Sequence, residues 1–143
     1  MHHPVPPGSV FPLLCPVRER DWLAGWDPTI VFTRSGITEP GCVFTTVGPE
    51  GALDVWTVSR HDPTQGVVEF VVVVTDLYVM TLDIALCAEP EGTRTVWRRT
   101  FTAFTPEGKR TIKALDDEQH GKRIAHLEAS INHYLETGTM LRA

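Results

Sequence analysis

The chain has few cysteines and no sign of a disulfide framework or a metal centre. It contains 3 cysteines, Cys15, Cys42 and Cys87, an odd number that cannot all pair within one chain. No Cys-x-x-Cys or His-x-x-x-His spacing occurs, and zinc sites usually need such spacing. We therefore expect reduced thiols, with Cys15 and Cys42 as small buried core residues, and neither a metal nor a cofactor.

Long apolar runs and basic clusters are also missing. The most apolar stretch, Val67–Val74, is interrupted by Glu69 and is far shorter than the roughly 20 residues that a membrane-spanning helix requires. The formal net charge is −5, and the densest basic sites are the pairs Arg98-Arg99 and Lys109-Arg110. Nucleic acid is a poor partner for such a chain, because a phosphate backbone binds a clustered basic face.

The first eight residues, MHHPVPPG, lack the apolar segment of a secretory signal, so we expect a cytoplasmic protein. They also contain three prolines and a glycine. We interpret residues 1–8, including His2 and His3, as a loose lead-in to a single domain that occupies residues 1–143. A hydrophobic content of 42% is enough for one core in a chain of 143 residues.

The sequence near the N-terminus predicts a strand and then a short helix. Residues 9–15 can form a strand whose register is limited by Pro12. Pro16 suits the first turn of a helix, where its missing N–H costs nothing. Trp22 and Trp26 give that helix an apolar face. Gly25 and Asp27-Pro28 are expected to end it.

Most of the rest of the chain alternates with the period of β-strands. The predicted strands cover residues 29–34, 41–47, 53–60, 67–74, 78–87 and 93–105. In the fifth of these, Tyr78, Met80 and Leu82 share one face, and Thr81 and Asp83 lie on the other. Turns, not helices, separate the strands, so the sheet must be an antiparallel meander.

A long helix is predicted at the C-terminal end. Asp116 is a plausible N-cap with Gln119 completing a capping box, and Gly138 is placed as the C-cap glycine. Ile124, Leu127, Ile131 and Leu135 form a single apolar stripe at helical spacing. A helix of about 21 residues spans roughly 30 Å, enough to cross the whole domain. Its interior Gly121 marks either a close approach to another backbone or a frayed first turn.

This order of elements predicts an α+β protein in which a curved antiparallel sheet wraps around a long C-terminal helix, with one or two short helices after the first strand. Such an arrangement usually encloses a cavity. The sequence also carries neither a phosphate-binding loop nor a nucleophile elbow, which would indicate a particular reaction.

The chain resembles the START/pollen-allergen-like superfamily (SRPBCC, with its polyketide cyclase/dehydratase-like members), and within it a small uncharacterised bacterial subgroup. Three segments carry the resemblance: CPVRE-x-DW-x-x-GW at residues 15–26, SG-x-x-E-x-G-x-x-F at 35–44, and NHYL-x-TG at 132–138. It extends from about Val10 to Gly138. It implies a helix-grip fold with an apolar cavity, and it does not imply a reaction, because members of the superfamily differ in function.

The favoured hypothesis is therefore a binding module that holds a small hydrophobic or aromatic molecule between the sheet and the final helix. The residues predicted to bind the ligand are Trp26, Phe44, Trp56, Tyr78, Met80, Leu82, Trp97, Phe101, His120, Ile124, Leu127 and Ile131.

Two alternatives stay open. A cyclase/dehydratase-like enzyme would use cavity residues such as His120, Glu39 and Tyr134 as acid–base groups, which must converge to do so. A protein-interaction domain would instead expose an apolar patch of several hundred Å². Arg18 and Glu19 either pair with charges after the first long strand, such as Arg34 and Glu39, or point into the cavity mouth as a polar anchor.

Overall fold

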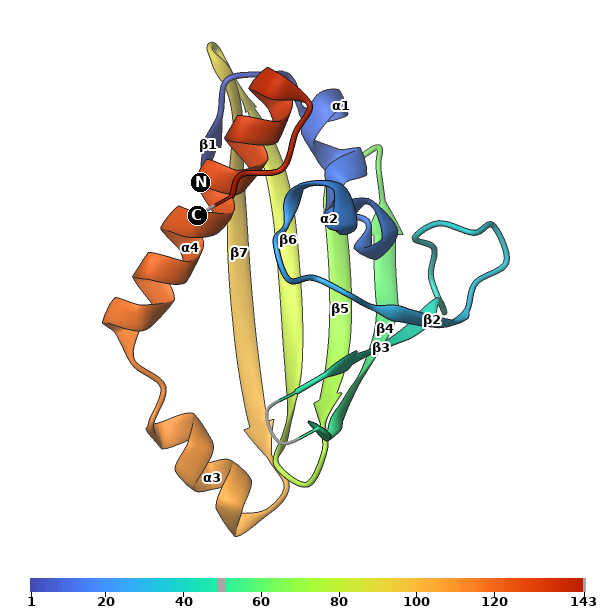
Figure 1. Cartoon of the computed structure of the whole chain (residues 1–143), viewed down its shortest axis with the longest axis vertical. Helices are drawn as coiled ribbons and strands as arrows, with labels where there is room; N and C mark the ends of the chain where they lie inside the picture. The colour runs from blue at the N-terminus through green and yellow to red at the C-terminus, as the bar shows by residue number, and fades with distance from the viewer. Residues whose placement is uncertain (49–50, 143) are drawn as a thin grey trace.

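A computed structural model, shown in Figure 1, describes residues 1–48 and 51–142. One curved sheet of seven strands has the order β1-β7-β6-β5-β4-β3-β2, and the helices cover one of its faces. The strands are β1 (His2–His3), β2 (Thr29–Phe32), β3 (Val43–Val47), β4 (Leu53–Asp62), β5 (Val67–Val74), β6 (Tyr78–Glu89) and β7 (Gly92–Ala103). The helices are α1 (Pro7–Val10), the 3-10 helix η1 (Phe11–Leu14), α2 (Pro16–Trp22), α3 (Pro106–Lys113) and α4 (Asp117–Thr137).

All neighbouring strands pair antiparallel, and their register aligns apolar side chains into rows across the sheet. One row runs across five strands and consists of Phe44, Trp56, Val72, Met80 and Phe101. Because side chains alternate between the two faces of a strand, the members of a row share one face. This is the concave face that is turned towards the helices, and it carries the larger part of the core.

The long helix α4 begins and ends where the sequence predicts. The Asp116 side chain caps it by accepting a hydrogen bond from the Glu118 backbone N–H at 2.8 Å, and Gly138 has a left-handed φ of 69°. Gln119 takes no described part in the cap and instead lies at a cavity mouth. The buried residues of α4, Leu127, Ser130 and Ile131, all belong to its second half. The first half is therefore held less tightly against the rest of the protein.

Residues 1–8 are not a loose lead-in, contrary to the sequence-based expectation. His2 and His3 pair with Arg94 and Thr93 as strand β1, at the edge of β7. His3 is fully buried, and its Nδ1 lies 2.7 Å from Oδ1 of Asn132 on α4. The expectation was wrong because local composition says nothing about a distant strand edge, whose unpaired backbone groups are satisfied by adding a strand.

The strand expected at residues 9–15 is also wrong, because this segment forms α1 and η1. Pro7 and Pro12 each occupy the first turn of one of these helices, where a missing N–H is tolerated. The segment still belongs to the core, since Val10, Leu13 and Leu14 are buried. The predicted helix that starts at Pro16 is confirmed as α2, but it ends at Trp22, so Trp26 lies beyond the helix and not on its face.

Helix α3 was not predicted from the sequence, where the last strand was extended to Thr105. Strand β7 ends at Ala103, and Thr105 caps α3 by accepting a hydrogen bond from the Gly108 N–H at 3.0 Å. Gly108 lies directly against the backbone of Leu77, so that a Cβ at this position would come within 1.7 Å of the Leu77 carbonyl oxygen. This contact fixes the direction in which the chain leaves the sheet before α4.

Candidate functional site

A cavity of about 260 Å³ lies between the concave face of the sheet and α4. Strands β4 to β7 supply most of its wall, and the first half of α4 closes it. Its lining residues are Asp54, Trp56, Val72, Val74, Tyr78, Met80, Leu82, Trp97, Arg99, Phe101, His120, Arg123, Ile124 and Leu127. The wall is thus mainly apolar and aromatic with a few polar groups, as in most small-molecule sites.

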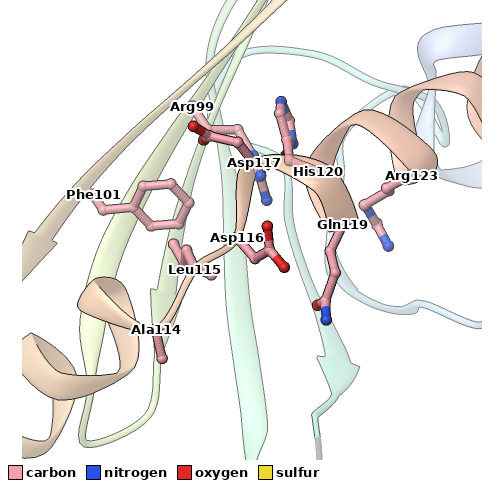
Figure 2. A pocket seen from close by; sticks show the side chains of 9 residues that line it. All are labelled: Arg99, Phe101, Ala114, Leu115, Asp116, Asp117, Gln119, His120 and Arg123. Carbon is pink, nitrogen blue, oxygen red and sulfur yellow. Dashed lines mark hydrogen bonds between the residues drawn. The ribbon is translucent and has the colours of Figure 1, made fainter.

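The cavity opens between β7 and the start of α4. Figure 2 shows this mouth, a hollow of about 400 Å³ with Arg99 and Phe101 on the strand side and His120 and Arg123 on the helix side. These four residues also line the interior cavity, so the two spaces adjoin. The remaining mouth residues are Ala114, Leu115, Asp116, Asp117 and Gln119.

At its other end the cavity narrows into a space of about 50 Å³ under α2. Aromatic rings fill this end: Phe44 and Trp56 stack with ring centroids 5.3 Å apart, and Trp26 meets Trp56 edge-on at 5.7 Å. Such pairs add about 0.5–1.5 kcal/mol each beyond the apolar area they bury. This end is therefore a rigid floor, and the open volume lies nearer the mouth.

The structure brings together most of the residues that the sequence predicts to bind a ligand. The residues that line the main cavity are Trp56, Tyr78, Met80, Leu82, Trp97, Phe101, His120, Ile124 and Leu127. Trp26 and Phe44 lie at the narrow end. Ile131 lines neither space, because it is fully buried in a separate cluster with Leu13, Trp22 and Leu127. Its place on the apolar stripe of α4 reflects packing against the N-terminal helices.

The sequence analysis did not single out Arg99, which lines both the mouth and the main cavity. Its neighbours in the register row are Leu82, Phe70 and Val58, all apolar. Its guanidinium donates a hydrogen bond to Nδ1 of His120 and lies 5.3 Å from the ring centroid of Phe101. Burial and then the charge of Arg123 lower the pKa of Arg99 from its ordinary value. Arg99 shares the strand face of Trp97 and Phe101, and this alternation was the available signal.

Glu19 of α2 lies at the narrow end, near enough to Arg123 for their charges to interact. Burial raises the pKa of Glu19 to about 8, and the charge of Arg123 opposes this shift. The sequence left open whether Glu19 pairs with charges such as Arg34 or points into the cavity. The structure favours the cavity position. Arg18 forms an ion pair with Asp21 of its own helix at 2.9 Å, and not with Glu39.

Of the three acid–base candidates that the sequence suggests, Glu39 and Tyr134 lie away from the cavity. Glu39 accepts hydrogen bonds from its own loop, from the Thr33 hydroxyl at 2.9 Å and from the Ser35 backbone N–H at 3.1 Å. Tyr134 packs with the buried cluster of Leu13 and Trp22. His120 alone of the three named residues lines the cavity, so His120, Glu39 and Tyr134 do not converge.

Cys15 and Cys42 are buried free thiols, as expected, and Cys87 is exposed. Burial, followed by the neighbouring Cys15, raises the pKa of the Cys42 thiol. Within residues 1–48 and 51–142, no three His, Cys, Asp or Glu side chains are grouped so that they could hold a metal ion. Over the same residues, no helix has the length and apolar character needed to cross a membrane.

Comparison with solved structures supports the fold. Ara h 8.0201 superposes with a TM-score of 0.66 at 18% identity, over 96% of this chain and 94% of that one. MLL2253 from Mesorhizobium loti gives 0.62 at 16% identity, over 95% and 93% of the two chains. DynU16, encoded in the dynemicin biosynthetic locus, gives 0.57 at 17% identity, and the match covers 97% of this chain and 46% of DynU16.

No family profile and no curated protein sequence matches the chain. The likeness to these structures is therefore one of fold, at a level of identity that carries no activity with it. The seven-stranded antiparallel sheet and the long C-terminal helix confirm the helix-grip fold that the sequence predicts.

Proposed function

We propose that this protein binds a small hydrophobic or aromatic molecule in the cavity between the sheet and α4. The observation that carries the proposal is an interior space of about 260 Å³ with Trp56, Met80, Trp97 and Phe101 in its wall. Ligand pockets usually measure about 300–1,000 Å³, and the adjoining mouth extends this cavity into that range. The ligand is therefore small, with an apolar body that the aromatic side chains enclose.

The energetics favour such a ligand. Apolar surface removed from water contributes about 25 cal/mol per Å², and here the wall is already assembled, so little ordering of the protein opposes binding. The stacked Phe44 and Trp56 hold the floor rigid. The open first half of α4 offers a route of entry, because its buried residues begin only at Leu127.

The structural neighbours support the proposal at the level of fold. DynU16 is encoded in the dynemicin biosynthetic locus, and 46% of its chain matches 97% of this one. This resemblance favours a small-molecule role over a purely structural one, although the fold by itself selects no ligand.

Acid–base catalysis on the bound molecule is a second candidate, and Glu19 is the observation that favours it. With a pKa of about 8, this carboxyl carries a proton at neutral pH and could donate it inside the cavity. Its test is the identity of the molecule that co-purifies with the protein. If Glu19 is catalytic, Glu19→Gln retains a molecule whose mass differs from that extracted from the wild type; identical molecules from both proteins contradict catalysis.

The binding proposal is tested with N-phenylnaphthylamine, a neutral aromatic probe that fluoresces in apolar surroundings. We expect saturable binding of one probe per chain. Ile124 lines the cavity from α4 whereas Ala125, the next residue, is exposed, so Ile124→Trp fills the cavity and Ala125→Trp is its matched control. Loss of binding in Ile124→Trp and its retention in Ala125→Trp support the proposal. Equal binding by both variants places the probe elsewhere and contradicts it.

A further inference from the structure

Two arginines border the cavity. Arg99 is half-buried on β7, and Arg123 extends from α4 at the place where the main cavity, the mouth and the narrow end meet. No ion pair within 4.0 Å among residues 1–48 and 51–142 includes either guanidinium. Two cationic groups thus border the cavity, Arg99 half-buried and Arg123 exposed, and neither has an ion-pair partner in the described part of the chain.

The carboxyl groups around the cavity form no described ion pair with either arginine. Burial raises the pKa of Glu19 to about 8, so this group is largely protonated at neutral pH, and Asp54 is the acidic residue in the wall of the main cavity. At the mouth, Asp116 caps α4, and Asp117 lies on the exposed first turn. Around Arg99 itself the wall is apolar, with Leu82 beside it on β6 and the Phe101 ring under its guanidinium.

Arg99 is placed as a ligand-binding group and not as a surface charge. Its neighbour Arg98 is exposed on the opposite face of β7, directly across from Asp83 on β6. Arg99 instead replaces an apolar side chain in the row of Leu82, Phe70 and Val58. Taking a guanidinium out of water costs free energy unless a hydrogen-bonding anion compensates, and His120 supplies only one acceptor atom.

We infer that the ligand is an amphipathic acid, an aromatic or apolar body bearing a carboxylate that Arg99 binds at the cavity mouth with Arg123 nearby. This inference rests on the proposed binding function and names its ligand class. A guanidinium presents parallel N–H donors that match the two oxygens of a carboxylate. The Phe101 ring packs against the Arg99 guanidinium and holds it in place. Trp97 and Met80 would pack against the apolar body of the ligand.

The inference is tested by displacing bound N-phenylnaphthylamine with either naphthoate or naphthamide. These two competitors share the same aromatic body and differ in charge. They are compared on the wild type, on Arg99→Gln, and on Arg98→Gln, which removes the same charge from the outer face of the same strand. Since a hydrogen bond to a charged group is stronger than one between neutral groups, we expect wild type and Arg98→Gln to bind naphthoate about tenfold more tightly than naphthamide, a difference of about 1.4 kcal/mol.

In Arg99→Gln we expect this preference to disappear, because the substitution removes the charged donor for the carboxylate of naphthoate. Equal affinities for acid and amide in the wild type, or a preference that survives in Arg99→Gln, would overturn the inference and leave the binding function standing. So would a failure of naphthoate to displace the bound probe. A wild type that binds no N-phenylnaphthylamine would instead contradict the proposed function, and the inference would fall with it.

Discussion

The Arg99 guanidinium on β7 donates a hydrogen bond to Nδ1 of His120 on α4, across the mouth of the cavity. Arginine can only donate, so Nδ1 accepts and the ring proton is carried on Nε2. This bond joins the sheet to the first half of α4, in which no side chain is buried. We therefore expect this bond, called the latch below, to restrain the start of α4 at the cavity mouth.

The first prediction concerns this latch. His120→Ala should speed both entry and release of N-phenylnaphthylamine by several-fold, because the helix start can then move away from β7 more often. Stability should change by less than about 1 kcal/mol, the usual contribution of one hydrogen bond. Stopped-flow fluorescence measures the rates. His126→Ala is the control, since His126 lies exposed on the same helix outside the cavity; equal effects of both substitutions would disprove the latch.

The second prediction concerns Glu19. Its pKa in the folded protein is about 8 against an ordinary 4.5, so the folded state keeps a proton that the unfolded state loses between these values. The free energy of unfolding should therefore fall as pH rises from about 5 to 8, by about 3 kcal/mol from this group. Urea unfolding should show that Glu19→Gln removes this slope. Glu136→Gln, on the exposed end of α4, should keep it; a slope shared by all three proteins would refute the assignment to Glu19.

His3 should produce a pH dependence of opposite sign. Burial lowers its pKa in the folded protein, so below the ordinary value of 6.5 the unfolded state binds the proton more readily. Stability contributed by neutral His3 is then lost as pH falls below about 6.5. His3→Gln, whose amide can still reach Asn132, should lack this loss, as urea unfolding at the two pH values can show. An unchanged difference between pH 7 and pH 5 would contradict it.

Two helical glycines give a matched pair of predictions. Gly121→Ala should stabilise the protein by about 1 kcal/mol, because the glycine lies in a helix interior and an added Cβ meets nothing within 4 Å. Gly108→Ala should destabilise it by about 3 kcal/mol, because its Cβ would overlap the Leu77 carbonyl. Thermal unfolding of the two variants is the measurement. If the effects have the same sign, the packing of α3 on Leu77 is not as described.

Local patterns were enough to predict the parts of the fold that depend on local physics. The alternation of Tyr78, Met80 and Leu82 indicated strand β6, though not which of its faces is inward, and the cap residues Asp116 and Gly138 defined α4. Both signals arise within a few residues of chain, through the two-residue period of a strand and the orphan backbone groups of a helix end.

The parts that were missed depend on contacts between distant segments. His3 became a buried strand residue because the edge of β7, some ninety residues away, offered backbone partners to it. Gly121 showed no close backbone approach, while Gly108, not noticed in the sequence, did. Whether a residue is tightly packed depends on which distant segment lies against it, here Leu77 against Gly108. A single sequence does not show such contacts.

The candidate site was predicted in its apolar part and missed in its charged part. Trp97 and Phe101 were assigned to the wall from their residue type, but Arg99 between them was not, although it shares their face. Composition-based reasoning places arginine on the surface by default. The alternation with Trp97 and Phe101 places Arg99 on their face, and the register, which sets Arg99 opposite Leu82, shows that this face is the inward one.

Binding in the cavity between the sheet and α4 is tested most directly by locating a bound apolar molecule. The four tryptophan indole N–H signals report its position by NMR. Each indole N–H has one described acceptor: Leu13 for Trp22, Pro16 for Trp26, Thr46 for Trp56 and Thr95 for Trp97. On addition of one equivalent of N-phenylnaphthylamine, we expect large chemical-shift changes for Trp56 and Trp97, which line the main cavity, and the smallest change for the fully buried Trp22. Saturable probe binding that leaves the Trp56 and Trp97 signals unmoved would contradict it.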